Sequence, residues 1–123
     1  MSLYQDTILD HYHNPRNFGL LENATHQATA LNPTCGDKLS LTLVIDDDTL
    51  CHIGFEGEGC AISLASASIL YESLLGKKVE EVAALEPTEV LRLTGLTLSP
   101  GRMKCALLSL ETLKTALRGK IEV

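Results

Sequence analysis

The strongest constraint on the fold is a pair of segments in which apolar and polar residues alternate. Residues 38–45 and 50–55 both show this pattern, and three consecutive aspartates at 46–48 separate them. A period of two residues is typical of a strand with one buried face, because successive side chains point to opposite sides of a sheet. Since the aspartates cannot be buried, the two segments are predicted to form an antiparallel hairpin.

Helical and turn patterns flank this hairpin. We expect helices at residues 2–13, 60–75, 79–85 and 104–118, a weak edge strand at 24–30, a turn at 87–93 and a loop at 96–101. This order predicts an α+β fold, in which a small antiparallel sheet of about three strands packs against several helices. A chain of 123 residues is the size of one domain, so residues 1–123 are interpreted as a single domain.

Charge and hydropathy exclude several classes of protein. The net charge of −6 argues against non-specific binding to nucleic acid. No apolar run approaches the roughly 18 residues that a membrane span needs, and the first residues lack the basic region of a signal peptide. We therefore expect a cytoplasmic protein with reduced cysteines and no membrane partner. Residues 99–120 are rich in basic side chains, which form either the solvated face of a helix or a docking patch beside Cys105.

Three of the four cysteines lie in loops or at junctions between a loop and a helix. Cys35 is part of a Pro-Thr-Cys-Gly-Asp turn, Cys60 follows a glycine-rich turn, and Cys105 comes shortly after a Pro-Gly pair. Cys60 and Cys105 are expected at helix N-termini, where unpaired N–H groups and the helix dipole favour the thiolate. Cys51 is different, because it lies within a predicted strand and is interpreted as a small buried hydrophobe.

The cysteine spacing alone leaves two interpretations open. No Cys-x-x-Cys pair occurs, so the cysteines are either inert buried residues or members of a shared site formed by the fold. Asp37 follows Cys35 by two residues and could add a carboxylate to three thiolates, a set that suits zinc or an iron–sulfur cluster. Because a carboxylate is displaced more easily than a thiolate, such a site would be able to open. Alternatively, Asp37 caps the turn before a strand.

Four parts of the sequence together resemble the U-type iron–sulfur cluster assembly proteins, the family of SufU, IscU and the N-terminal domain of NifU. They are Tyr4 with residues 8–12 and 14–19, Asn32-Pro33-Thr34-Cys35-Gly36-Asp37, Gly57-Glu58-Gly59-Cys60-Ala61-Ile62-Ser63 and Arg102-Met103-Lys104-Cys105. The resemblance extends over nearly the whole chain and implies a SufE/NifU-like fold. It also implies that Cys35, Asp37, Cys60 and Cys105 together hold zinc at rest or a nascent 2Fe–2S cluster.

Within that family the sequence is similar to both SufU and IscU. Residues 58–63 and 102–105 resemble SufU, because IscU typically has a histidine at the position of Lys104. The Leu-Pro-Pro-Val-Lys chaperone motif of IscU does not occur at residues 98–102. The compact segment between Cys60 and Cys105, by contrast, resembles IscU, since SufU usually carries an insert there.

The resemblance implies two alternative functions. In the first, the protein is a scaffold that receives sulfur from a cysteine desulfurase, builds a 2Fe–2S cluster and transfers it to acceptor proteins. In the second, it is a zinc-dependent sulfurtransferase that activates a SufS-type cysteine desulfurase. Cys35 would then leave zinc and accept the persulfide sulfur. The scaffold is the leading hypothesis, and it is a carrier rather than an enzyme.

Overall fold

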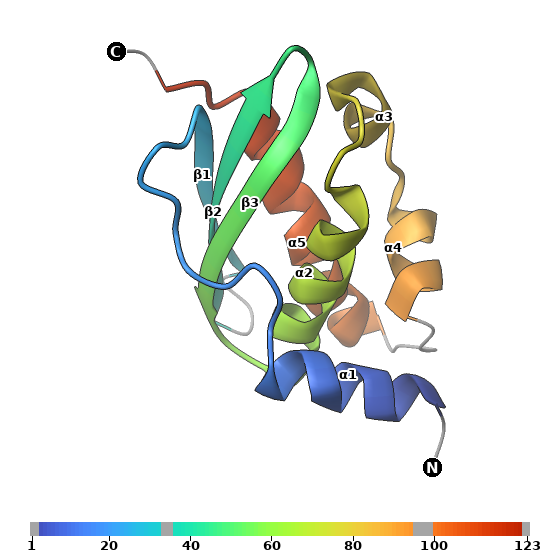
Figure 1. Ribbon diagram of the computed structural model, residues 1–123. Helices are drawn as coiled ribbons and strands as arrows, with labels where there is room; N and C mark the ends of the chain where they lie inside the picture. Colours follow the sequence, from blue (N-terminus) through green and yellow to red (C-terminus); the bar gives the residue numbers. More distant parts are fainter. Residues whose placement is uncertain (1–2, 33–35, 95–99, 122–123) are drawn as a thin grey trace.

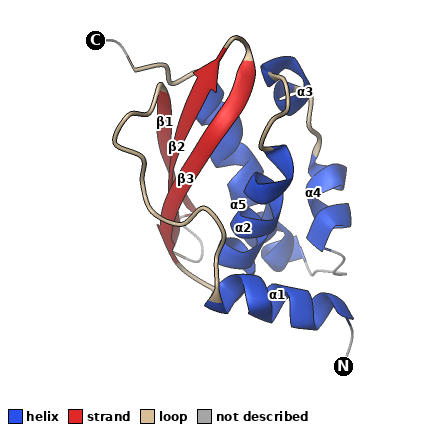
Figure 2. Ribbon diagram, viewed as in Figure 1, coloured by secondary structure: helices blue, strands red, loops and turns tan. Residues whose placement is uncertain are grey.

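The computed structural model describes residues 3–32, 36–94 and 100–121, which form a three-stranded sheet and five helices. The elements in chain order are α1 (Leu3–His13), β1 (His26–Asn32), β2 (Asp37–Asp46), β3 (Thr49–Glu58), α2 (Ala61–Leu74), α3 (Val79–Ala83), α4 (Pro87–Thr94) and α5 (Pro100–Leu117). The strands are antiparallel in the order β1-β2-β3. Figure 1 shows α2 and α5 beside one face of the sheet, and Figure 2 shows the same separation of strands from helices. The predicted α+β fold is confirmed.

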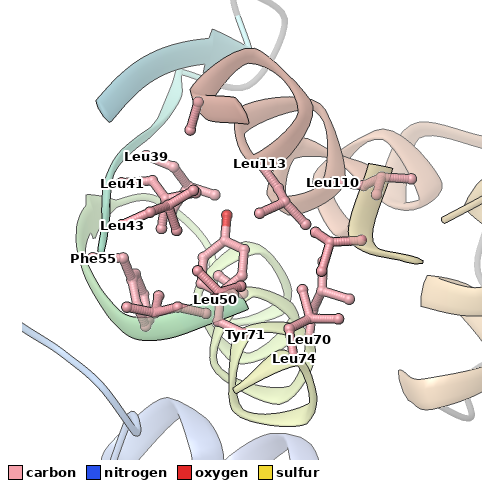
Figure 3. Packing of buried hydrophobic residues seen from close by; sticks show 14 of the residues in the cluster. Leu39, Leu41, Leu43, Leu50, Phe55, Leu70, Tyr71, Leu74, Leu110 and Leu113 are labelled. Atoms are coloured by element: carbon pink, nitrogen blue, oxygen red, sulfur yellow. The ribbon is translucent and has the colours of Figure 1, made fainter. Parts of the chain in front are cut away.

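The core lies between the sheet and the helices α2 and α5. Leu39, Leu41 and Leu43 alternate along β2 with more polar neighbours, and all three are buried. Figure 3 shows these leucines directed toward Tyr71 of α2 and Leu113 of α5. This apolar cluster holds the two helices against the sheet.

Tyr71 also joins the two core helices by a polar contact. Its hydroxyl donates a hydrogen bond of 2.8 Å to the backbone carbonyl of Ser109 in α5. The side chain is completely buried, and burial raises the pKa of Tyr71 because the charged phenolate would lose its solvation. The neutral hydroxyl is therefore a fixed donor between α2 and α5.

Two helical segments differ from the sequence prediction. Residues 87–93 were predicted as a turn, but they lie in α4, in which Val90 and Thr94 are buried on the same side, four residues apart. Burial against the core therefore extends the proline-started turn into a helix. The last helix was predicted from residue 104, but it begins at Pro100, because proline is favourable in a first helical turn. Cys105 consequently lies in the second turn of α5 and not at its N-terminus.

The prediction that Cys51 is buried is wrong. On the partner strand Val44 pairs with His52, whereas the next residue, Ile45, pairs with Leu50. Cys51 is therefore the extra residue of a β-bulge, which interrupts the alternation of the two faces. Its side chain is exposed, and Leu50 and Ile53 are the buried residues on either side of the bulge.

A polar cluster attaches α1 to α2. The Ser68 hydroxyl lies 2.7 Å from Nδ1 of the buried His11 and accepts a 2.9 Å hydrogen bond from the backbone N–H of Arg16. The Arg16 guanidinium pairs with Asp10 at 2.7 Å and lies 3.7 Å from a Glu72 carboxylate oxygen. These contacts hold α1 and the chain that follows it against α2.

Among the described helices, none is long and apolar enough to cross a bilayer.

Burial lowers the pKa of His11, and the nearby Arg16 acts in the same direction. A lowered pKa means that the folded chain favours the neutral ring. The stabilisation is therefore present above the unfolded pKa of about 6.5 and is lost as the pH falls below that value. We expect His11→Gln to destabilise the protein by roughly 1 kcal/mol at pH 7.5, with a smaller difference at pH 5.5. Urea unfolding at both pH values measures this.

The matched control is His13→Gln, because His13 is exposed on the same helix. This variant should keep the difference in stability that the wild type shows between the two pH values. If His11→Gln also kept the wild-type change in stability between pH 7.5 and pH 5.5, the buried imidazole of His11 would not be the cause of that change.

Candidate metal centre

Three elements that are distant in sequence begin at the same place. Asp37 is the first residue of β2, Cys60 is the N-cap residue of α2, and Cys105 lies in α5. Each of the three offers a ligand atom, and these atoms all lie within 4.8 Å of one another. In Figure 1 the starts of β2, α2 and α5 lie at the same end of the molecule, which is the lower end in that view.

Asp37 is buried, with 1% of its surface exposed, and its carboxylate has defined partners. Oδ1 accepts a hydrogen bond of 3.0 Å from the backbone N–H of Cys60, and Oδ2 accepts one of 2.5 Å from the Ser63 hydroxyl. Cys60 has extended backbone geometry and makes no side-chain cap of its own. Asp37, which belongs to β2, therefore provides a hydrogen-bond acceptor for a backbone N–H at the start of α2. The helix dipole favours a negative charge at this end of the helix.

Gly59 makes room for this carboxylate. Its φ of +146° lies in a region that residues with a side chain rarely adopt, and a Cβ at this position would collide with Asp37 Oδ1. Gly59 thus permits both the unusual backbone conformation and the close approach of the Asp37 carboxylate to the backbone.

We expect Gly59→Ala to weaken zinc binding by at least about 10-fold, because the added methyl group displaces Asp37. Gly76→Ala is the matched control, since Gly76 also has a positive φ, of +85°, but its Cβ would meet no atom within 4 Å. Both variants should lose about 1 kcal/mol of stability from backbone strain. Only Gly59→Ala should lose affinity in a competition titration with a chromophoric chelator. Equal affinities in the two variants would contradict the role given to Gly59.

The two described thiols of the site differ in burial. Cys60 is half-buried, and its Sγ lies 3.8 Å from Asp37 Oδ2 and 3.6 Å from Ser63 Oγ. Cys105 is 6% exposed. The expected position of Cys60 at a helix N-terminus is confirmed. Cys105 reaches the same place from the second turn of α5.

The donor set fits a metal ion. With Zn–S and Zn–O distances of about 2.3 and 2.1 Å, tetrahedral coordination separates a sulfur ligand from an oxygen ligand by roughly 3.6 Å. The distance of 3.8 Å between Cys60 Sγ and Asp37 Oδ2 is already close to this value, and the remaining separations need only a small contraction. Thiolates with one carboxylate suit zinc or iron–sulfur chemistry, and a cation would balance negative charge gathered in a buried position.

The structure brings together three of the four residues predicted for the site, namely Asp37, Cys60 and Cys105. Cys35 lies outside the described residues. From the sequence, Ser63 was named only as the last residue of a family motif and was given no role in the site, although its hydroxyl hydrogen-bonds Asp37. The Cys-x-x-Ser spacing at a helix start resembles a capping box and could have indicated a polar role for this serine.

This chain is an α+β domain with two thiols and a carboxylate gathered into a possible metal site, and comparisons with known proteins identify its family. The model of the NifU-like N-terminal domain matches residues 3–119, so the chain belongs to that family. It is 37% identical to the zinc-dependent sulfurtransferase SufU of Bacillus subtilis, over 92% of this chain and 88% of the relative. It is 36% identical to the iron–sulfur cluster assembly scaffold protein IscU of Streptococcus pyogenes, over 94% of this chain and 83% of that relative.

The fold comparison agrees with the sequence comparison. A crystal structure of the putative iron–sulfur cluster assembly scaffold protein for the SUF system of Fervidobacterium islandicum superposes with a TM-score of 0.77. That chain is 28% identical, and the match covers 95% of this chain and 96% of the other. The predicted membership in the U-type family is therefore confirmed.

Proposed function

We propose that this protein is an iron–sulfur cluster assembly scaffold, which receives sulfur, builds a 2Fe–2S cluster and transfers it. The observation that carries the proposal is the convergence of Asp37, Cys60 and Cys105 at one end of the fold. The similarity to a protein named as the scaffold IscU supports it. The scaffold is one domain, residues 1–123, that acts in the cytoplasm.

Four side chains hold the cluster in this proposal: Cys35, Asp37, Cys60 and Cys105. A single residue, Gly36, separates Asp37 from Cys35, so the carboxylate at the start of β2 is close in sequence to the fourth proposed ligand. Cys35 is also the proposed sulfur acceptor. Its thiolate attacks the outer sulfur of a persulfide on the donor, the donor's S–S bond breaks, and the donor leaves as a thiolate.

The proposed partners are a cysteine desulfurase and the acceptors of the finished cluster. Beside the site, a groove is lined by Leu31, Asn32, Lys104, Leu107, Leu108 and Glu111. Leu31 is 62% exposed at the end of β1, and Lys104 is exposed next to Cys105. An apolar side chain and a cation next to the site suit the docking of a protein that delivers sulfur.

The second candidate is a zinc-dependent sulfurtransferase that activates a desulfurase. It is favoured by the similarity to the Bacillus subtilis protein of that name and by Lys104 at the position where IscU typically has histidine. Zinc would be held by the same four residues, and it would keep their sulfurs ionised.

One pair of measurements tests both functions. Under anaerobic conditions, zinc-free protein is incubated with iron(II), cysteine, a reductant and a catalytic amount of a cysteine desulfurase, and its visible absorption is followed. A scaffold should acquire the bands of a cluster in a ratio of one cluster to one or two chains. If no cluster forms and the zinc-loaded protein instead stimulates the desulfurase, with the stimulation lost in Cys35→Ala, the sulfurtransferase replaces the scaffold.

A further inference from the structure

Ser63 is in contact with two of the residues that form the candidate metal centre. Its side chain is completely buried in the first turn of α2. The hydroxyl oxygen lies 2.5 Å from Asp37 Oδ2 and 3.6 Å from Cys60 Sγ. A buried polar group is normally paired, and here the pairing is with a residue of the site and not with the helix backbone.

The contact has a consequence for the orientation of Asp37. Cys60 N–H holds Oδ1 and the Ser63 hydroxyl holds Oδ2, so both oxygens of one carboxylate are bound to the same helical turn. Two hydrogen bonds at the two ends of a planar group fix its rotation about the bond to Cβ. A carboxylate oxygen can accept more than one contact, so these two hydrogen bonds are compatible with metal binding by Asp37.

The chemistry of the donor is suited to a ligand that must remain charged. A lysine or arginine in place of Ser63 would neutralise the carboxylate and compete with the metal ion. A hydroxyl orients the carboxylate without cancelling its charge. Hydrogen-bond partners of this kind fix the geometry of metal ligands, and removing them typically lowers metal affinity 10- to 100-fold.

We propose that Ser63 is a positioning residue that holds the Asp37 carboxylate in the orientation in which it binds a metal ion. The inference rests on the proposed metal-holding function. Ser63 acts through Asp37 and does not itself bind the metal.

The experiment compares two serines of the same helix. Ser63→Ala removes the hydroxyl that binds Asp37, while Ser66→Ala removes a buried hydroxyl for which the described residues provide no hydrogen-bond partner. Both are completely buried, and alanine is favourable in a helix, so both variants should fold. In a competition titration with a chromophoric chelator, Ser63→Ala should bind zinc roughly 10- to 100-fold more weakly than the wild type. Ser66→Ala should keep the wild-type affinity.

A double-mutant comparison separates positioning from a general structural role. If Ser63 acts through Asp37, adding Ser63→Ala to Asp37→Ala should not lower zinc affinity further. The visible spectrum of bound Co²⁺ should also change in Ser63→Ala and remain unchanged in Ser66→Ala. An affinity loss that persists in the Asp37→Ala background would overturn the positioning role.

The outcomes also separate this inference from the proposed function. A wild-type chain that binds neither zinc nor a cluster would refute the metal-holding function and the inference with it. If the wild type binds zinc, Asp37→Ala weakens the binding and Ser63→Ala does not, the function stands and the inference alone fails.

Discussion

Replacing Cys105 by alanine should weaken zinc binding by more than about 100-fold. Loss of a residue that only hydrogen-bonds a metal ligand typically lowers metal affinity 10- to 100-fold, and loss of a direct ligand should lower it further. Cys60→Ala should have an effect of the same order. The measurement is a competition titration on zinc-free protein, together with the zinc content of each variant as purified.

The fold should survive this change. Leu39, Leu41 and Tyr71 form the core with residues of α5, and none of these contacts requires a metal ion. Removing a single buried sulfur should therefore lower the free energy of unfolding by about 1 kcal/mol. Circular dichroism and urea unfolding of the zinc-free variant measure this.

The chain provides a matched control in Cys51. This cysteine is exposed at the bulge of β3, so Cys51→Ala should change stability by less than about 0.5 kcal/mol and leave zinc affinity unchanged. Equal zinc affinity in Cys51→Ala and Cys105→Ala would show that Cys105 is not a ligand.

Asp37→Ala should retain a 2Fe–2S cluster longer than the wild type, which is expected as a longer half-life of the bound cluster. The carboxylate is the hardest of the four proposed ligands and the one most easily displaced by an incoming acceptor. Without it, release begins with the loss of a thiolate, which is slower. The decay of cluster absorption in air and in the presence of a chelator measures the half-life, and a faster decay than wild type would contradict the argument.

This kinetic effect is separate from two equilibrium effects of the same substitution. Asp37 caps the first turn of α2 through the Cys60 N–H, so the zinc-free variant should lose about 1 kcal/mol of stability. Zinc affinity should also fall, because a ligand is lost. A slower release of the cluster together with weaker zinc binding is therefore the expected combination.

The hairpin was predictable because its cause is local. The alternation along β2 and β3 and the charged turn between them are written in consecutive residues, and the structure has both strands. The bulge at Cys51 was not predictable, because it depends on how Ile45 and Leu50 pair across two strands. Helix α4 was missed for a similar reason, since the burial of Val90 and Thr94 comes from packing against distant residues.

Some features of the candidate site were likewise predictable from local sequence, and others were not. The start of β2 at Asp37 and the start of α2 at Cys60 were recognisable from neighbouring residues, to within one residue. The bond between Ser63 and Asp37 joins α2 to β2, and no pattern within either segment specifies that pairing. Resemblance to a family selected the proposed metal ligands, while the hydrogen bond between Ser63 and Asp37 is found only in the structure.

The bulge in β3 has a practical consequence for counting thiols. Cys51 lies near the Asp46–Thr49 turn, whereas Asp37 and Cys60 lie at the opposite end of the hairpin. An alkylating reagent will therefore react with this outlying sulfhydryl whether or not the centre is loaded. A Cys51→Ser background removes that reaction, so that the remaining reagent uptake reports stoichiometrically on protection of the sulfurs at the centre.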